Sequence, residues 1–317
     1  MKIRIALLMM LLAAWSTLPA AETATATPRV FGSAPQIDKA EKAPILAATH
    51  SLKRVVAVGD FGIVILSDDG KSFRQAKTVP TRSVLTSVFF VAQRGWAVGH
   101  DGIVITTGDG GETWQVLREE SGKDRVLLSV WFENPQHGFV VGQFGLVMET
   151  MDGGKTWNER RLIEGEAGDK HLLHIFPAGA GLVLIVAETG AILRSEDNGK
   201  NWQLVQTDNR GSFWTGLALN DGTLLVAGMR GHIYRSNDRG LTWKEVPSTT
   251  LQSLTGLVQN KDGTVLAAGL SGTVLSSKDQ GQSFTASVLP DRSNLTAIVN
   301  GPAGELLFSL GGLVKKQ

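Results

Sequence analysis

The stretch TGDGGETW at residues 107–114 decides the architecture of this chain, because it occurs in six versions along the sequence. Each version has a Ser or Thr, an Asp, a Gly and an aromatic residue in this order. A carboxylate at this spacing can accept hydrogen bonds from backbone N–H groups of the following turn, and Gly permits that tight turn. We therefore predict that these Asp-box motifs are scaffolding, with the carboxylates Asp69, Asp109, Asp152, Asp197, Asp238 and Asp279.

A second pattern precedes each motif and extends the repeat over most of the chain. A Gly followed by apolar residues recurs at intervals of 40 to 45 residues, at Gly62, Gly102, Gly145, Gly190, Gly231, Gly272 and Gly312. The residues around it alternate between apolar and polar, as in half-buried strands, and one unit contains strands near 84–90, 95–98, 102–106 and 113–117. Four short strands per repeat predict an all-β, seven-bladed β-propeller with four-stranded antiparallel blades.

The last repeat is incomplete, which raises the question of how the ring closes. Residues 293–317 provide three strands and end before an Asp-box. A missing fourth strand would leave an open sheet edge. We expect the N-terminal segment 27–42, through residues 27–37, to supply this strand, so that both ends of the chain meet in one blade of a propeller spanning 43–317.

The N-terminus has the features of an export signal. Lys2 and Arg4 precede an uncharged, mostly apolar run at residues 5–18 and then small residues. This order is typical of a secretory signal peptide, and the run is shorter than the roughly 20 residues that span a bilayer. We expect a signal peptide at 1–26, cleaved after Ala26 or Ala21, and a periplasmic mature chain without a transmembrane segment.

Composition excludes several classes of site. The net charge is +1, only 19% of residues are charged, and there is no Cys. A general nucleic-acid binder is usually far more basic, and a chain without Cys has no disulfide, thiolate–metal site or thiol nucleophile. The Asp-boxes lack the ligand spacing of a calcium loop. We therefore expect no metal, no cofactor and no nucleic-acid partner, and a monomer.

A recurring cation marks the most promising surface. In a propeller, the loops that enter each first strand share one face with the loops between the second and third strands, and the Asp-box turns lie on the opposite face. A cation stands before six first strands, and Arg230 lies in a neighbouring loop; the predicted basic ring is Lys42, Arg82, Arg125, Lys170, Arg210, Arg230 and Arg292. Like charges around one channel mouth create a positive potential. The alternative is that they pair with Asp60, Asp101 and Glu188.

Other conspicuous side chains fit packing better than chemistry. Tyr234, the only Tyr, aligns with apolar residues of third strands. His171 and His174 are three residues apart on a strand and would point to opposite faces, so they would not share a metal. Trp131 and Trp214 lie in or beside first strands, where they either fill the channel or offer a platform for a ligand; we favour packing.

These repeats behind a signal peptide resemble the photosystem II assembly and stability factor family of β-propellers, within the broader BNR/Asp-box repeat proteins. The resemblance covers about residues 40–317. It implies a non-catalytic factor that binds assembly intermediates of membrane proteins through a basic patch. Arg82, Arg125, Arg210 and Arg292 are the positions that would match this patch.

The N-terminus departs from the photosynthetic members of that family. Cyanobacterial members are typically lipoproteins, and plant members carry a plastid transit peptide, whereas this chain has no Cys and a bacterial export signal. We therefore expect a non-photosynthetic bacterium and a different client. Relatives in such bacteria are often associated with large inner-membrane exporters, which makes an exporter a candidate client by analogy.

The alternative class is a sialidase-like glycoside hydrolase or a glycan-binding module. Sialidases carry Asp-boxes, but they need an Arg cluster and a Tyr nucleophile, and the lone Tyr234 lies on a third strand. A generic glycosidase could use two of Asp60, Asp101 and Glu188, since this reaction needs two carboxyl groups at a set distance. Exposed Trp131 and Trp214 at the channel mouth would favour a glycan- or lipid-binding module.

Overall fold

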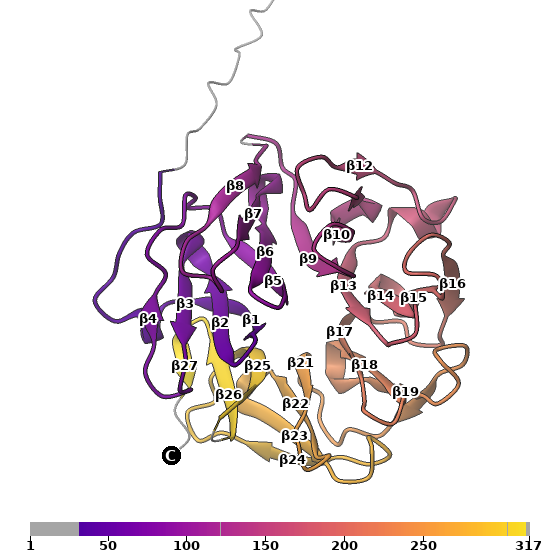
Figure 1. Cartoon of the computed structure of the whole chain (residues 1–317). Helices are drawn as coiled ribbons and strands as arrows, with labels where there is room; N and C mark the ends of the chain where they lie inside the picture. Colours follow the sequence, from indigo (N-terminus) through magenta and orange to yellow (C-terminus); the bar gives the residue numbers. More distant parts are fainter. Residues whose placement is uncertain (1–31, 121, 303, 315–317) are drawn as a thin grey trace, which may run out of the picture.

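The computed structural model describes residues 32–120, 122–302 and 304–314, and within them the chain forms seven antiparallel sheets around a central axis (Figure 1). This confirms the predicted seven-bladed β-propeller. The expected signal peptide at 1–26 and its two cleavage sites lie outside the described residues. No helix of the described part is long and apolar enough to span a bilayer.

The blades follow one another along the chain. Blade 1 contains β1 (Ile45–Ser51), β2 (Arg54–Gly59), β3 (Val64–Ser67) and β4 (Arg74–Gln75). Blade 2 contains β5 (Leu85–Val91), β6 (Arg94–Gly99), β7 (Val104–Thr107) and β8 (Gln115–Arg118). Blade 3 contains β9 (Leu127–Phe132), β10 (Gly138–Gly142), β11 (Val147–Thr150) and β12 (Asn158–Glu159). Blade 4 contains β13 (Leu172–Pro177), β14 (Val183–Ala187), β15 (Ala191–Ser195) and β16 (Gln203–Gln206).

The second half of the ring repeats this order. Blade 5 contains β17 (Phe213–Ala218), β18 (Leu224–Gly228), β19 (Ile233–Ser236) and β20 (Lys244–Val246). Blade 6 contains β21 (Leu254–Gln259), β22 (Val265–Gly269), β23 (Thr273–Ser277) and β24 (Thr285–Val288). Blade 7 contains β25 (Leu295–Gly301), β26 (Gly304–Ser309) and β27 (Gly312–Val314).

Short 3-10 turns connect the second and third strands of the first six blades: η2 (Asp60–Gly62), η3 (His100–Gly102), η4 (Gln143–Gly145), η6 (Glu188–Gly190), η7 (Met229–Gly231) and η8 (Leu270–Gly272). Two others, η1 (Ala40–Lys42) and η5 (Glu166–Asp169), precede β1 and β13. These turns lie at equivalent places in the repeat, as the recurring Gly predicted.

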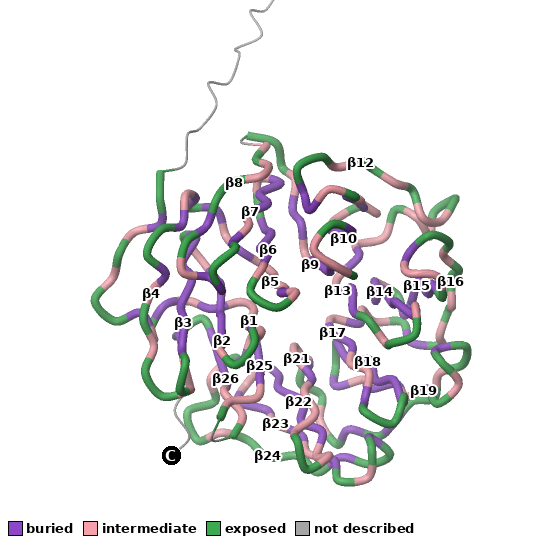
Figure 2. Tube along the Cα trace, in the orientation of Figure 1, coloured by how far each residue is buried: buried purple, intermediate pink, exposed green. Residues whose placement is uncertain are grey.

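The second and third strands of the blades are the most buried, because neighbouring blades pack face to face. Every residue of β14 and β18 is buried, whereas all of the outer strand β24 is exposed. Figure 2 shows the same gradient around the ring, with buried residues concentrated in the second and third strands. Burial on both faces explains why these strands read as continuous runs of Val, Ile, Leu and Ala rather than as a strict alternation.

Hydroxyl groups join the first strands of neighbouring blades. Thr86 Oγ1 donates to Leu127 O at 2.6 Å, and Thr296 Oγ1 donates to Ile45 O at 2.6 Å. The second of these bonds connects blade 7 to blade 1, where His50 Nε2 also lies 2.7 Å from Asn300 O. The ring is therefore closed by side-chain bonds between β1 and β25 as well as by packing.

The expected closing strand is wrong for the part of it that the structure describes. Among the described residues, blade 7 has three strands, and residues 32–37 follow the outer edge of blade 1 instead of pairing with β27. Ala34 N donates to Val79 O at 2.9 Å, and Ile37 N donates to Gln75 Oε1 at 3.1 Å. Residues 27–31 lie outside the described part. A shared apolar cluster with Ile45 and Phe308 joins the two ends of the ring.

Candidate functional site

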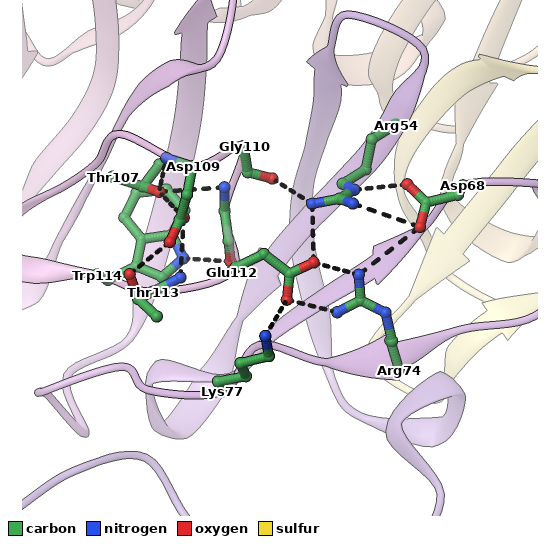
Figure 3. A network of polar contacts seen from close by, with 11 residues as sticks. Arg54, Asp68, Arg74, Lys77, Thr107, Asp109, Gly110, Glu112, Thr113 and Trp114 are labelled. Atoms are coloured by element: carbon green, nitrogen blue, oxygen red, sulfur yellow. Dashed lines mark hydrogen bonds and ion pairs between the residues drawn. The ribbon is translucent and has the colours of Figure 1, made fainter.

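The Asp-boxes hold their own turns, in the geometry that the motif predicts. In blade 2, Asp109 Oδ1 accepts from Thr113 N at 3.0 Å, and Thr107 Oγ1 accepts from Gly111 N at 3.1 Å (Figure 3). Trp114 folds back over the turn, and its Nε1 donates to Gly111 O at 3.0 Å. All of these partners lie within eight residues, so the motif acts locally.

The carboxyl groups of the Asp-boxes consequently have lowered pKa values. The Thr156 hydroxyl and backbone N–H, both bonded to Asp152, hold the pKa of that carboxyl at about 2, below its ordinary 3.8. Asp69, Asp197, Asp238 and Asp279 also have a pKa of about 2. These lowered values mean that the unfolded chain takes up protons first as the pH falls.

Acid should therefore weaken the fold through these turns. The stabilisation is complete above about pH 5 and is lost progressively as the pH falls towards 2, because the native pKa lies below the unfolded one. We expect Asp152→Asn to unfold at a lower urea concentration than wild type at pH 7. At pH 3 the urea midpoints of the two proteins should lie closer together. An unchanged difference at the two pH values would contradict this origin of the stability.

An ion-pair network lies next to the blade 2 Asp-box and joins it to blade 1 (Figure 3). Glu112 contacts Arg54 at 3.0 Å and also pairs with Arg74. Arg54 reaches Asp68 at 2.6 Å, and hydrogen bonding to Arg54 lowers the pKa of Asp68. This network ties the outer parts of two blades together, and it belongs to the scaffold.

The opposite face, which we call the turn face, consists of the turns η2, η3, η4, η6, η7 and η8, the β26–β27 turn and the loops that enter each first strand. In each of the six 3-10 turns the second residue is left-handed, with φ between 53° and 57°; these residues are Phe61, Asp101, Phe144, Thr189, Arg230 and Ser271. Such a conformation costs energy for any residue with a Cβ. The surrounding backbone must therefore hold each turn in place.

Backbone hydrogen bonds tie the turns η3, η4, η6 and η8 to the entry loop of the next blade. Gly102 N donates to Arg125 O at 2.8 Å, and Gly145 N donates to Lys170 O at 2.9 Å. The same bond recurs between Gly272 N and Ser293 O at 2.8 Å. The predicted cations therefore lie beside the turns of the preceding blade, on the turn face.

The seven predicted cations differ in how much of their charge is compensated. Arg125 pairs with Glu159 at 2.5 Å and with Glu120 at 3.4 Å, and Arg82 Nε donates to the backbone oxygen of Ser33 at 3.0 Å. Within the described part of the chain, no ion pair involves Lys42, Lys170, Arg210, Arg230 or Arg292. Most of the ring is thus free to meet an anionic partner, whereas Arg125 is held by its own carboxylates.

The three acids proposed as partners of these cations serve their own turns instead. Asp60 Oδ1 accepts from Phe61 N at 2.7 Å, and Asp101 Oδ2 accepts from Ser83 Oγ at 3.0 Å. Glu188 Oε2 accepts from the backbone N–H of His171 at 2.9 Å. They belong to blades 1, 2 and 4, and each stabilises a loop of its own blade.

The central channel is lined by residues of all seven first strands and contains a cavity of about 280 Å³. His174 lines this cavity and is partly buried, and its Nδ1 accepts from Gly216 N at 3.1 Å. Burial lowers the pKa of His174 to about 4, so its ring is neutral at neutral pH. Trp214 borders the channel, whereas Trp131 is buried and stacks on Phe139 with the ring centres 6.1 Å apart.

Two further sequence expectations can be compared with the structure. Tyr234 is buried in the core, as predicted, and its hydroxyl donates to Asp208 Oδ1 at 2.8 Å. No cluster of three metal-ligating side chains occurs among the residues that the structure describes.

The sequence reasoning missed the apolar side chains of the turn face. Leu251 is 85% exposed, Phe144 72%, Leu310 57% and Phe61 54%. Each lies in a turn or entry loop, where alternation gives no signal. A column-by-column comparison could have found Leu310, because the first turn residue is polar in blades 1–4 and apolar in blades 5–7. It could also have found Leu251, which replaces the cation of the other entry loops, and Phe61 and Phe144, which share the second turn position.

Comparisons with known proteins agree with this architecture. No curated protein matches the chain significantly. Solved structures include YCF48 bound to a D1 peptide, at 20% identity and a TM-score of 0.68, covering 90% of this chain and 94% of that one. YCF48 from Cyanidioschyzon merolae matches at 16% identity and a TM-score of 0.67, covering 90% and 97% of the two chains.

A glycoside hydrolase has the same fold. The GH74 enzyme of Niastella koreensis matches at 15% identity and a TM-score of 0.68, covering 90% of this chain and 53% of the enzyme. At such identities these likenesses show the fold alone. The family model described as photosynthesis system II assembly factor YCF48, in contrast, matches residues 119–284, just over half of the sequence. The chain therefore belongs to the YCF48 family of photosystem II assembly factors.

Proposed function

We propose that this protein is a non-enzymatic, exported binding scaffold that assists the assembly of a membrane protein complex at the periplasmic surface. The observation that carries the proposal is the turn face of a YCF48-family propeller, where five cations of the basic ring have neither an ion pair nor a side-chain hydrogen bond to the described residues. A related propeller binds a D1 peptide, which supports a protein segment as the kind of ligand. The export signal supports the periplasm, and a large inner-membrane exporter is the candidate client.

Electrostatics should govern how the client is recognised. The unpaired cations Lys42, Lys170, Arg210, Arg230 and Arg292 lie on one face, so they would attract an acidic segment and orient it. Exposed charges are screened over a Debye length of about 10 Å at 0.1 M salt. We therefore expect client affinity to fall as salt rises.

The test is a pull-down from detergent-solubilised membranes of the source organism, with the mature chain as bait. The variant with Glu at Arg82, Arg210, Arg230 and Arg292 should lose the membrane protein that wild type captures. Arg125 is left intact, because it is already paired with Glu120 and Glu159. We expect the captured amount to fall at least about tenfold, the scale of a few lost charge contacts.

A matched control reverses four cations of the opposite face. Lys53, Lys71, Lys155 and Lys200 are exposed and lie in the β1–β2 turn or in Asp-box turns. Their replacement by Glu changes the net charge equally and should leave capture unchanged. If both variants lose the membrane protein equally, a specific role of the turn face is refuted. The same holds if neither wild type nor the control variant captures a membrane protein.

A glycan-binding module, or a glycoside hydrolase, is the second candidate. Trp214 borders the channel and is only partly buried, so it offers an aromatic surface to a sugar. A glycan array with wild type and Trp214→Ala would test this candidate. Binding that disappears in the variant would favour it, and absence of any bound glycan would leave the assembly role as the better account.

A further inference from the structure

The turn face is divided into two chemically different halves. The first residue of the turn between the second and third strands is polar in blades 1–4, where it is Asp60, His100, Gln143 and Glu188. In blades 5–7 the same position holds Met229, Leu270 and Leu310. The entry loop of blade 6 adds Leu251 at the place where six other entry loops carry a cation. The first turn position is therefore apolar only in blades 5–7, whereas the exposed Phe61 and Phe144 occupy the second turn position in blades 1 and 3.

These side chains alternate with cations around the rim. Following the ring from the entry of blade 5 to the entry of blade 1, the residues of this cationic–apolar arc are Arg210, Met229, Arg230, Leu251, Leu270, Arg292, Leu310 and Lys42. Its members lie on loops that touch. Arg230 N donates to Ser253 Oγ at 3.4 Å, and Gly272 approaches Arg292 so closely that a Cβ on it would lie 2.9 Å from the Arg292 Cα.

The arc is open to solvent and carries a positive charge. Leu251 is 85% exposed and Leu310 57%, which is unusual for large aliphatic side chains that share one face. Its four cations have no ion-pair partner among the described residues. Four acids lie in the same entry loops: Asp208 is bonded to Tyr234, Asp291 is bonded to Ser293, and Asp38 and Glu41 stand beside Lys39 and Lys42 in the entry loop of blade 1. With Lys39, the arc and its entry loops hold five cations against these four acids.

The geometry favours a flat, anionic surface as the occupant. The turns η3, η4, η6 and η8 share one backbone bond to the next entry loop, so these turns are held against the neighbouring blade in the same way. Short aliphatic side chains on separate tips can all enter one planar interface at once. Neighbouring Arg and Lys side chains can meanwhile reach phosphate groups at its surface.

We propose that the cationic–apolar arc docks on an anionic phospholipid bilayer. Its aliphatic side chains enter the boundary between headgroups and acyl chains, and its cations pair with lipid phosphates. On the membrane, Arg82 and Lys170, which lie in the entry loops of blades 2 and 4, then stay available to an extramembrane segment of a client, while the cations of the arc are shared between client and lipid. Lipid docking does not require the client, so it can be tested apart from the proposed function.

Sedimentation with sucrose-loaded vesicles tests the proposal. The mature chain should bind vesicles of phosphatidylcholine mixed with phosphatidylglycerol and bind pure phosphatidylcholine much more weakly. Replacing both Leu251 and Leu310 by Asp should weaken vesicle binding at least about tenfold, because it removes the inserting groups and adds repulsion. Arg230→Gln with Arg292→Gln should reduce the preference for the anionic lipid.

The matched control places Asp on the opposite face. Leu52 and Leu241 are 64% and 55% exposed, and Asp at both should change vesicle binding less than about twofold. Circular dichroism and thermal unfolding of all variants confirm that they are folded. If wild type does not sediment with anionic vesicles, or if the control weakens binding as much as the arc variant, the proposal is overturned.

The detergent pull-down separates this inference from the proposed function, because it contains no bilayer. Loss of vesicle binding in the arc variant with normal client capture supports a lipid-docking arc. If the arc variant loses the client in detergent while wild type fails to bind vesicles, the arc is a protein-docking surface and the lipid proposal is wrong.

Discussion

Replacing Trp96 by Ala is expected to lower the free energy of unfolding by about 3–5 kcal/mol, as for other fully buried aromatic residues. Trp96 on β6 is fully buried and stacks on Phe132 of β9, with the ring centres 3.6 Å apart and an interplanar angle of 8°. Its Nε1 also donates to Gly153 O in the blade 3 Asp-box at 3.0 Å. The substitution would open a cavity between two blades and remove a bond that joins them.

Urea unfolding followed by tryptophan fluorescence and circular dichroism measures this effect. Trp96→Phe keeps most of the stacking and loses the hydrogen bond, so it should cost about 1–2 kcal/mol. Trp214→Ala is the matched control, because Trp214 is only partly buried at the channel, and it should cost less than Trp96→Ala. Equal losses for the two alanine variants would contradict the role assigned to the contact between blades 2 and 3.

Gly145→Ala is expected to have an effect of similar size, about 3 kcal/mol or more, for a different reason. Gly145 has φ +69°, a left-handed value that is strained for Ala. A Cβ on it would also lie 1.8 Å from Gly168 O, which is backbone and cannot rotate away. The loop before β13 would have to move, and the bond from Gly145 N to Lys170 O would break or lengthen.

Substitutions at two other glycines distinguish the cost of a left-handed backbone from the cost of a steric clash of the new Cβ. Gly222 has φ +87° and no heavy atom within 4 Å of the Cβ position, so Gly222→Ala should show the conformational cost alone, about 1 kcal/mol. Gly108 has neither a left-handed φ nor a near neighbour, so Gly108→Ala should be nearly neutral. Thermal and urea unfolding at one pH measure how much stability each of the three variants loses. A Gly145→Ala variant no less stable than Gly222→Ala would show that the entry loop yields easily.

The number of blades and the scaffold role of the Asp-boxes could be predicted because their causes are local. Asp109 reaches its partners within four residues along the chain, so the motif reads directly as a turn. The repeat interval then counts the blades. The topology of the strands also predicted that the cations lie in entry loops on one face of the propeller. Lys170 and Arg292 do lie in these loops.

The closing of the ring could not be predicted in the same way. The missing strand of blade 7 suggested that residues 27–37 would fill it, but residues 32–37 bond to Gln75 and Val79 at the edge of blade 1. Edges of both blades offer similar backbone groups, and strand propensity does not distinguish them. The side-chain amide of Gln75, which donates to Pro35 O at 2.7 Å, contributes to the choice.

The sequence by itself determined the propeller, its seven units and the chemistry of each turn, because these depend on contacts between residues close together in the chain. The tertiary structure alone decided which charges remain unpaired. Arg125 meets Glu159, which lies 34 residues away on the outer strand β12 of the same blade, whereas Arg210 and Arg292 meet no carboxylate in the described part. It also decided that Leu251 and Leu310, from different blades, face solvent on one rim. Such properties depend on which residues, far apart in the chain, the folded strands and loops bring together, and no spacing along the chain records this.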